Sequence, residues 1–345
     1  MDTNNIELTF CTTSMNRTHH LKQTLPQNLL DNSDNTNVDF LILDYNSSDG
    51  LEKWIKSEMR EHLNSGKVKY FRTEEPLFFN RSHSRNLMFR LAEGKYICNI
   101  DADNYTGLGF GDYLLNVFKQ NPNTIIIPDL EGKYYKLQDA VGRFCCSKED
   151  FMAIDGYDEQ MEGYGYEDVD LYHRLLQLER EVEVIKNLDF LKAIKHGNEE
   201  RVQNEYFATY FDSMLIKYIS HLESEIIVLF SDGKFLKSII RRPTNKEIPP
   251  VILLNNAWKQ GSWTKTEENI SLQVENGDFQ EFKWNQKDEY FQHKDSKFYL
   301  FKGINVLANI DYKLSLITNY GRFMLNKTTK EKINPSGFGI GNVNS

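Results

Sequence analysis

Short apolar runs alternate with longer amphipathic segments over the first 200 residues, and this alternation strongly constrains the fold. Runs of strand length lie at Ile6–Thr12, Val38–Asp44, Val68–Phe71, Tyr96–Asp101 and Thr124–Pro128. Segments with helical spacing of apolar residues lie between them, at Arg17–Leu30, Leu51–Leu63, Ser82–Ala92 and Gly111–Lys119. This pattern predicts an α/β domain with a mainly parallel sheet and helices on both faces.

The pattern changes after residue 200. Val202–Ser220 reads as one helix, and from about Ile226 short strand-like runs follow one another closely, the last at Tyr312–Ile317. Turn pairs such as Asp232-Gly233 separate some of these runs. We therefore predict an α/β domain over residues 1–200, a connecting helix over 201–221 and a smaller β-rich accessory domain over 222–345. We expect its end, residues 334–342, to lie loosely on the surface.

Charge and composition restrict the partners and the location of the protein. Asp and Glu outnumber Lys and Arg by 50 to 41, and the net charge of −9 argues against a broad basic surface for nucleic acid. The longest apolar runs, such as Phe40–Leu43, are far shorter than the roughly 20 residues that span a bilayer. The N-terminus lacks the features of a signal peptide, and the four cysteines are scattered. We expect a cytoplasmic protein with reduced cysteines and without nucleic-acid partner or transmembrane segment; peripheral membrane association stays open.

Closely spaced carboxylates follow the predicted strands. The fourth strand ends in Asp101-Ala102-Asp103, and the second ends in Asp44. Ligands of such sheets bind beyond the carboxyl ends of the strands, and carboxylates spaced like Asp101 and Asp103 can hold Mg²⁺ or Mn²⁺ against a diphosphate. Asp44 could accept hydrogen bonds from a base or a ribose. Both features have a plainer alternative, a solvated turn for the pair and an N-cap or Asx turn for Asp44.

A second carboxylate pair, Glu167-Asp168, lies where a Gly-rich loop meets a predicted helix with an apolar stripe at Leu171, Leu175 and Leu178. A helix N-terminus favours ionised carboxylates, as a general base near neutral pH requires. The alternative is that the two acids only complement the helix dipole. We favour a catalytic role, because the metal-type motif lies upstream.

Several segments, in this order, resemble a known family. They are Thr12-Thr13-Ser14-Met15-Asn16-Arg17, the run from Asp44 to Asp49, Arg85-Asn86 and Asp101-Ala102-Asp103. Together they resemble the family 2 glycosyltransferases of the GT-A fold, a Rossmann-like α/β fold. A further block, Gly156-Tyr157-Asp158-Glu159 with residues 163–175, is similar to the catalytic segment of β-1,4-galactosyltransferases and bacterial chondroitin polymerases. The resemblance covers roughly residues 6–200.

The resemblance implies roles for individual residues. Asp103 and His196 would ligate Mn²⁺ or Mg²⁺, and Asp101 would share this metal site and contact the ribose or sugar of the donor. Asp168 would be the catalytic base, Glu167 would bind and orient the acceptor, and Tyr164 would stack on an acceptor sugar. The other expected donor-binding residues are Thr12, Arg17, Asp44, Phe79, Arg81, Arg85 and Asn86.

These observations predict an inverting, metal-dependent glycosyltransferase with residues 1–200 as its catalytic domain. It would move a sugar from a UDP-sugar to a hydroxyl of a saccharide or lipid-linked saccharide, in the synthesis of a surface polysaccharide or glycoconjugate. One alternative is a non-catalytic protein of the same fold that binds nucleotide sugars or carbohydrate. Another is a nucleotidyltransferase, which would need a Gly-rich basic loop after the first strand, where this chain has Thr12-Thr13-Ser14-Met15.

Overall fold

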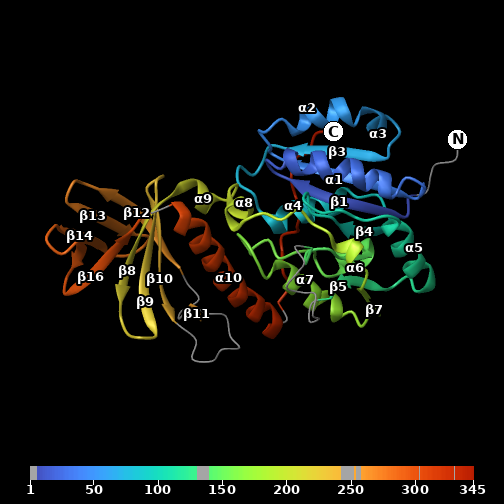
Figure 1. Cartoon of the computed structure of the whole chain (residues 1–345). Coiled ribbons are helices and arrows are strands. Elements are labelled where there is room, and N and C mark those ends of the chain that lie inside the picture. The colour runs from blue at the N-terminus through green and yellow to red at the C-terminus, as the bar shows by residue number, and fades with distance from the viewer. Residues whose placement is uncertain (1–5, 130–139, 242–251, 254–257, 303, 330) are drawn as a thin grey trace. The chain divides into compact units, whose positions relative to one another are not determined.

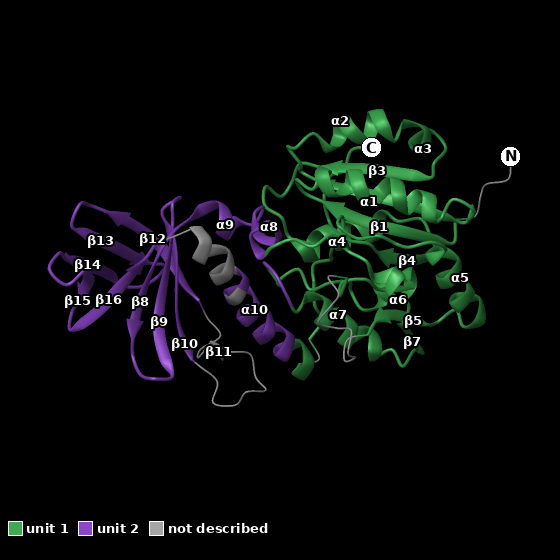
Figure 2. Cartoon of the chain, in the orientation of Figure 1, with its two compact units in different colours: residues 1–162, 166–197, 326–345 green, residues 163–165, 198–325 purple. Residues whose placement is uncertain are grey.

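A computed structural model of the chain describes residues 6–129, 140–241, 252–253, 258–302, 304–329 and 331–345 (Figure 1). The chain divides into two units, which Figure 2 colours separately. Unit 1 comprises residues 1–162, 166–197 and 326–345, and unit 2 comprises residues 163–165 and 198–325. No helix among the described residues is both long enough and apolar enough to cross a membrane.

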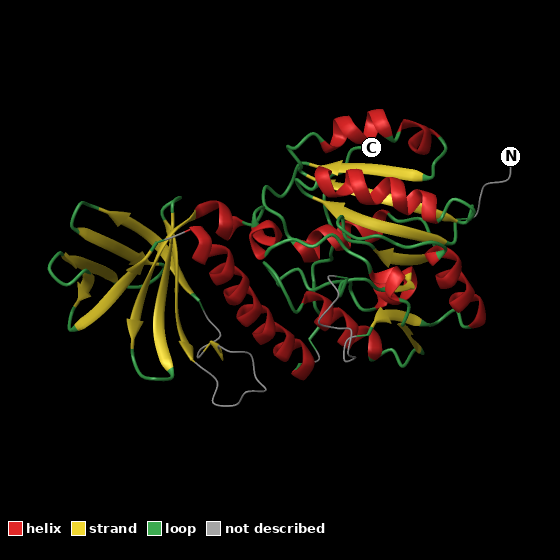
Figure 3. Ribbon diagram, in the orientation of Figure 1, coloured by secondary structure: helices red, strands yellow, loops and turns green. Residues whose placement is uncertain are grey.

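Unit 1 is built on a mainly parallel sheet, visible among its helices in Figure 3. Its described strands are β1 (Leu8–Ser14), β2 (Val38–Tyr45), β3 (Val68–Thr73), β4 (Tyr96–Asn99), β5 (Ile125–Pro128), β6 (Cys145–Ser147) and β7 (Val182–Ile185). They lie in the order β3-β2-β1-β4-β6-β5-β7. All neighbours run parallel except at β6, which pairs antiparallel with β4 and β5. The predicted α/β architecture is confirmed.

Helices cover both faces of this sheet. They are α1 (Thr18–Asp31), α2 (Leu51–Glu58), α3 (Arg60–Asn64), α4 (Arg81–Leu91), α5 (Phe110–Gln120), α6 (Lys148–Ala153), α7 (Glu167–Leu176) and the 3₁₀ helix η2 (Leu188–Leu191). Alternate residues of a strand enter two separate apolar clusters, because successive side chains point to opposite faces. In β2, Phe40 and Ile42 join the cluster under α1, α2 and α5, whereas Leu41 and Leu43 join the one under α4 and α7.

Unit 2 is β-rich, as predicted. Its strands are β8 (Phe211–Tyr218), β9 (Glu223–Phe230), β10 (Lys234–Arg241), β11 (Ile252–Leu253), β12 (Lys259–Lys265), β13 (Asn269–Val274), β14 (Phe279–Asn285), β15 (Tyr290–His293) and β16 (Ser296–Phe301). They pair antiparallel, and β10 pairs with β9, which closes the sheet on itself; β11 is appended to β10. The helices of this unit are α8 (Asn198–Val202), α9 (Tyr206–Tyr210) and most of α10 (Ile304–Thr328).

Two predictions for the second half of the chain are wrong. The connecting helix expected over residues 201–221 is replaced by the end of α8, by α9 and by β8, because residues 211–218 find a partner strand in β9. The strand expected at Tyr312–Ile317 lies inside α10. A short apolar run fits either a helix or a strand, and its neighbours in space decided both cases.

The C-terminal segment is also not as expected. Residues 326–345 belong to unit 1 instead of the accessory domain predicted over 222–345. Phe338 is only 6% exposed and joins the apolar cluster beside α4 and α7. Asn344 forms an isolated antiparallel bridge with Arg72, the next-to-last residue of β3. Far from lying loosely, the end of the chain completes the core of unit 1.

Candidate active site

The carboxyl ends of β1, β2 and β4 lie side by side and carry the polar segments of the sequence. In the parallel register Ser14 is opposite Asp44, and Cys11 is opposite Asn99. The loop after β4, which bears Asp101 and Asp103, therefore begins in the middle of the sheet. This is the edge at which ligands of parallel sheets bind.

Buried polar residues of α1 hold the loop after β4. The Thr24 hydroxyl donates to the carbonyl of Ala102 at 2.7 Å, and the Asn28 amide donates to the carbonyl of Asn104 at 3.0 Å. Both side chains come from the face of α1 that packs on the sheet, and both are almost fully buried. Because buried hydrogen bonds of this kind are costly to break, they fix the backbone on which Asp101 and Asp103 stand.

Arg85, on α4, joins the two carboxylate motifs. Its Nη2 lies 3.1 Å from Asp101 Oδ1, and its Nη1 lies 2.9 Å from Asp168 Oδ1 and 3.7 Å from Glu167 Oε1. A Cβ added at Gly142 would be 3.0 Å from Arg85 Nη2, 3.1 Å from Asp168 Oδ2 and 3.2 Å from Asp101 Oδ2. The guanidinium and both carboxylates therefore lie close together around residue 142, where glycine, which has no side chain, leaves space for them.

Burial and charge act differently on the three acids. Burial tends to raise the pKa of Asp101, but the Arg85 guanidinium and the Asn99 amide outweigh it and hold that pKa below its ordinary value. Burial raises the pKa of Asp168 against the attraction of Arg85. Burial and the charge of Asp168 raise the pKa of Glu167 to about 7. The expected preference of the helix N-terminus for ionised acids is thus outweighed by desolvation.

Asp103 and His196 lie in contact although 93 positions separate them. The imidazole Nε2 is 3.0 Å from Asp103 Oδ2, and this hydrogen bond raises the pKa of His196. An isolated bridge between Asn104 and Ala193 brings the two chain segments together, with Ile194 donating to the carbonyl of Asp103 at 2.8 Å. Carboxylates are common ligands of Mg²⁺ and Mn²⁺, and imidazoles are common ligands of softer divalent ions. A site that combines the two fits the predicted divalent metal. Asp101 instead faces Arg85.

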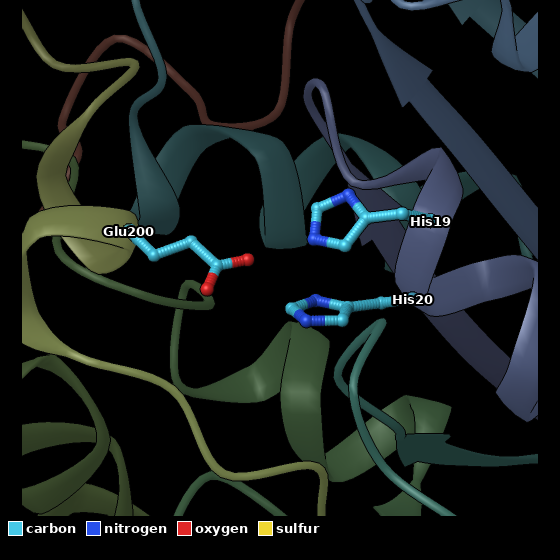
Figure 4. A group of neighbouring side chains, drawn as sticks. All are labelled: His19, His20 and Glu200. Carbon is cyan, nitrogen blue, oxygen red and sulfur yellow. The ribbon is translucent and has the colours of Figure 1, made fainter.

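Two further histidines lie near this pair. His19 and His20 lie in the first turn of α1, which begins at Thr18. Figure 4 shows their imidazoles next to one another, and the ring centroids are 4.1 Å apart. The ring of His20 is 5.4 Å from that of His196. The imidazole of His20 therefore lies beside the predicted metal ligand His196, and the imidazole of His19 lies next to that of His20.

Asp44 has a structural role that the donor-site prediction did not foresee. Its carboxylate is fully buried and accepts hydrogen bonds from the Tyr70 hydroxyl at 2.7 Å, Arg72 Nη1 at 2.8 Å and the Ser47 amide at 2.8 Å. The bond from the Ser47 amide, three residues on, has the spacing of an N-cap hydrogen bond. These bonds hold the turn after β2, and donor binding by Asp44 remains a prediction.

Asn86 is likewise a support and not a surface residue. It is fully buried, its Nδ2 donates to the Tyr157 carbonyl and to Glu159 Oε1, both at 2.9 Å, and its Oδ1 accepts from the Tyr157 amide at 2.7 Å. The amide of Asn86 thus holds residues 157–159, and its donor binding remains a prediction.

The other expected donor-binding residues lie at or near the same edge. Thr12 is buried within β1, and Arg17 directly precedes α1. Phe79 packs edge-on against Tyr45 at 5.8 Å, and the Arg81 guanidinium lies over its ring at 5.4 Å. Donor binding by Thr12, Arg17, Phe79 and Arg81 remains a prediction.

Tyr164 belongs to unit 2. Its ring lies 5.0 Å from that of Tyr312, and its hydroxyl accepts a hydrogen bond from Arg201 Nη1 at 3.0 Å. Stacking of Tyr164 on an acceptor sugar also remains a prediction.

Sequence reasoning missed two residues at this site. Tyr157, fully buried, donates its hydroxyl to Asp168 Oδ1 at 2.9 Å. Arg143, also fully buried, donates to Asn104 Oδ1 at 3.1 Å, and burial lowers its pKa to about 10. Tyr157 lies inside a motif that resembles the galactosyltransferases, which is the signal that could have found it. No local pattern marks Arg143.

Two solved structures illustrate a remote similarity to the chain. TarS 1–349 of S. aureus is 13% identical, with a TM-score of 0.43 over 52% of this chain and 58% of that one. The mannosyltransferase PcManGT of Pyrobaculum calidifontis, solved with GDP-Man and Mn²⁺, is 14% identical, with a TM-score of 0.46 over 59% and 63%. The chain thus spans less than two thirds of the length of either solved chain. No curated protein sequence matches the chain significantly.

Two family models match adjoining parts of the sequence. Residues 9–143 match the model described as glycosyl transferase family 2, and residues 125–197 match the one described as the N-terminal domain of galactosyltransferase. Together the two matches contain Arg85, both carboxylate motifs and His196. They confirm the resemblance predicted from the motifs. Residues 9–143 are thus similar to the family 2 glycosyltransferases, and residues 125–197 are similar to galactosyltransferases.

Proposed function

We propose that unit 1 transfers a sugar from a UDP-sugar to a hydroxyl of a saccharide or lipid-linked saccharide, with inversion at the anomeric carbon. The observation that carries this proposal is the position of Arg85, which contacts Asp101 and Asp168 at once. It puts the proposed base of the second motif beside the proposed donor site of the first. A transferase needs this proximity, because the acceptor must attack a carbon that is still bonded to the diphosphate.

Asp168 is the proposed base. Its Oδ1 is held by Arg85 and by the Tyr157 hydroxyl, each at 2.9 Å. Among the described residues no donor reaches Oδ2, and the side chain is 15% exposed. Oδ2 is then the oxygen that takes the proton of the acceptor hydroxyl as this hydroxyl attacks. A single base on the acceptor side implies one displacement and therefore inversion.

The proposed metal ligands are Asp103 and His196, whose polar atoms already lie 3.0 Å apart. A bound Mn²⁺ or Mg²⁺ ion would neutralise charge on the departing nucleoside diphosphate. The Asn104–Ala193 bridge holds the two chain segments that carry these ligands side by side. Asp101, turned toward Arg85, is proposed to contact the ribose or sugar of the donor and to join the metal site only after a change of rotamer.

Glu167 is the proposed acceptor-binding residue. Only 5% of it is exposed, and its Oε2 has no hydrogen-bond partner among the described residues. A buried acceptor atom without a partner is costly unless a ligand supplies a donor. A hydroxyl of the acceptor sugar would supply one, next to the base that activates its neighbour.

A screen of UDP release tests the proposal. UDP-galactose, UDP-N-acetylgalactosamine, UDP-N-acetylglucosamine and UDP-glucose are each incubated with the protein in Mn²⁺, Mg²⁺ or EDTA. We expect release from at least one of them in metal and loss of release in EDTA. Asp168→Asn should lower release by about 10²–10⁴-fold, with UDP affinity by calorimetry unchanged. Asp112→Asn, in the exposed first turn of α5, is the matched control and should behave as wild type.

Other outcomes identify the alternatives. Binding of UDP without release from any donor would favour the non-catalytic nucleotide-sugar-binding protein. Release of pyrophosphate from a nucleoside triphosphate would favour the nucleotidyltransferase. Wild-type release by Asp168→Asn would exclude this residue as the base.

A further inference from the structure

The C-terminal segment of unit 1 reaches the loop that touches the proposed base. We propose that this segment, residues 331–345, is a positioning element of the active site. Asn334 holds the loop of residues 155–159, and Tyr157 of that loop orients the carboxylate of Asp168. The inference rests on the proposed function, because it takes Asp168 as the base.

The first link runs from Tyr157 to Asp168. The Tyr157 hydroxyl donates to Oδ1 at 2.9 Å, on the oxygen that Arg85 also binds. The tyrosine ring is fully buried, 6.2 Å from the rings of both Phe144 and Phe151. A packed aromatic ring cannot follow a mobile carboxylate, so the hydroxyl sets the rotamer in which Oδ2 remains available.

The second link runs from Asn334 to the backbone of the loop. Its Nδ2 donates to the carbonyls of Tyr157 at 2.6 Å and Asp155 at 2.9 Å, and its Oδ1 accepts from the Glu159 amide at 3.1 Å. One side chain thus satisfies three backbone groups on both sides of Tyr157. Asn334 has φ +48°, a left-handed conformation that asparagine tolerates better than most residues.

The segment itself is anchored independently of Asn334. Phe338 packs edge-on against Phe151 at 6.1 Å, and the amide of Gly339 donates to Glu159 Oε1 at 2.6 Å. A Cβ added at Gly339 would lie 2.6 Å from the carbonyl carbon of Asn86. The backbone at Gly339 therefore packs directly against α4. The segment is thus part of unit 1 and can hold the loop of residues 155–159 in position.

This arrangement separates a positioning role from a purely structural one. Loss of a purely structural contact lowers stability, and its effect on turnover should be the same with and without the Tyr157 hydroxyl. Loss of a positioning contact lowers turnover through Tyr157, and the loss should vanish when the Tyr157 hydroxyl is absent. A double-mutant cycle measures this difference.

The experiment uses the full chain and UDP release from the donor found in the screen. Tyr157→Phe keeps the ring and should lower kcat about tenfold with the KM for the donor unchanged, as expected for one hydrogen bond to a charged group. Asn334→Asp keeps the shape but turns an acceptor toward two carbonyls, and should lower kcat by a similar factor. In the Tyr157→Phe background it should change kcat less than about twofold. Asn342→Asp, an exposed asparagine of the same segment, is the matched control.

A pH profile provides a second readout. The Tyr157 hydroxyl favours the ionised form of Asp168, so Tyr157→Phe should raise the pKa of that carboxyl and move the acidic limb of kcat/KM to higher pH. The other charged or titratable groups that act on this carboxyl are Arg85 from α4, Asp101 after β4, and Glu167 and Tyr172 from α7. They are unchanged in the variant.

Each result is decisive. Equal effects of Asn334→Asp in both backgrounds, or wild-type kcat in either single variant, overturn the inference. If Asn334→Asp does not fold, Asn334→Gly, which also tolerates the positive φ, replaces it; failure of both to bind UDP would make the segment purely structural. If Asp168→Asn is inactive while both positioning variants are normal, only this inference fails. If Asp168→Asn is fully active, the proposed function fails first.

Discussion

Glu167→Gln should change how the stability of the protein depends on pH. Glu167 Oε2 is buried without a hydrogen-bond partner among the described residues, and the nearest guanidinium, of Arg85, is 3.7 Å from Oε1. That guanidinium is already bonded to Asp168 at 2.9 Å. Burial, together with the charge of Asp168, therefore raises the pKa of Glu167 from 4.5 to about 7.

The sign of the effect follows from proton binding. Between about pH 4.5 and 7 the folded protein keeps the Glu167 proton that the unfolded chain has lost, so stability falls as the pH rises through this window. Each unit of pKa difference is worth about 1.4 kcal/mol, so the rise in pKa corresponds to about 3 kcal/mol in all. Glutamine does not titrate. Relative to wild type, the free energy of unfolding of the variant should therefore rise by up to about 3 kcal/mol between about pH 5 and pH 8.

Thermal unfolding measures this gain. For a domain of this size 1 kcal/mol shifts Tm by about 2–4 °C, so the Tm difference between Glu167→Gln and wild type should change by up to about 6–12 °C over that range. The melts are made in EDTA without nucleotide. Glu162→Gln, an exposed glutamate in the preceding loop, should follow wild type at every pH. A Tm difference for Glu167→Gln that is the same at both ends of the range would refute the reasoning.

Three further predictions concern the metal, the second strand and the C-terminal segment. Asp103→Ala should weaken UDP binding about tenfold or more in Mn²⁺ and leave it unchanged in EDTA, because the residue is proposed to act only through the cation; calorimetry in the two buffers would reveal any metal-independent loss. Asp44→Asn should cost about 3 kcal/mol in urea unfolding, because it leaves Arg72 and Tyr70 with a weaker buried partner; an unchanged free energy of unfolding would contradict this structural role. Phe338→Ala should cost about 3 kcal/mol, and an unchanged urea midpoint would show that the segment is not part of the core.

The strands and helices of unit 1 were predictable because their signals are local. Apolar residues recur with the period of a strand or a helix, and a sheet buried on both faces needs continuous apolar strands such as Phe40–Leu43. The segment Tyr312–Ile317 is the contrary case. Its short apolar run fits both periods, and the longer context of α10 decides for a helix.

The candidate site was only partly predictable. Asp101, Asp103, Glu167 and Asp168 were found from their place after strands and at a helix start, whereas His196 was found from family resemblance alone. The contact between Asp103 and His196 depends on the bridge between Asn104 and Ala193, which are 89 positions apart in the sequence. Asp44 shows that position after a strand does not by itself identify a role. A carboxylate there can bind a ligand or stabilise a turn, and the neighbouring groups, here the Ser47 amide and the Tyr70 hydroxyl, decide which contacts it makes.

By itself, the sequence determined the α/β class of unit 1, the β-rich character of unit 2 and the two carboxylate motifs, since all of these follow from residues close together in the chain. Only the tertiary structure decided that Arg85 joins the motifs, that Glu167 lies buried without a partner and that the last residues pack beside Tyr157. Those features depend on which distant groups share a desolvated space. Desolvation and charge pairing act through space, and the order of residues along the chain does not reveal the distances on which they depend.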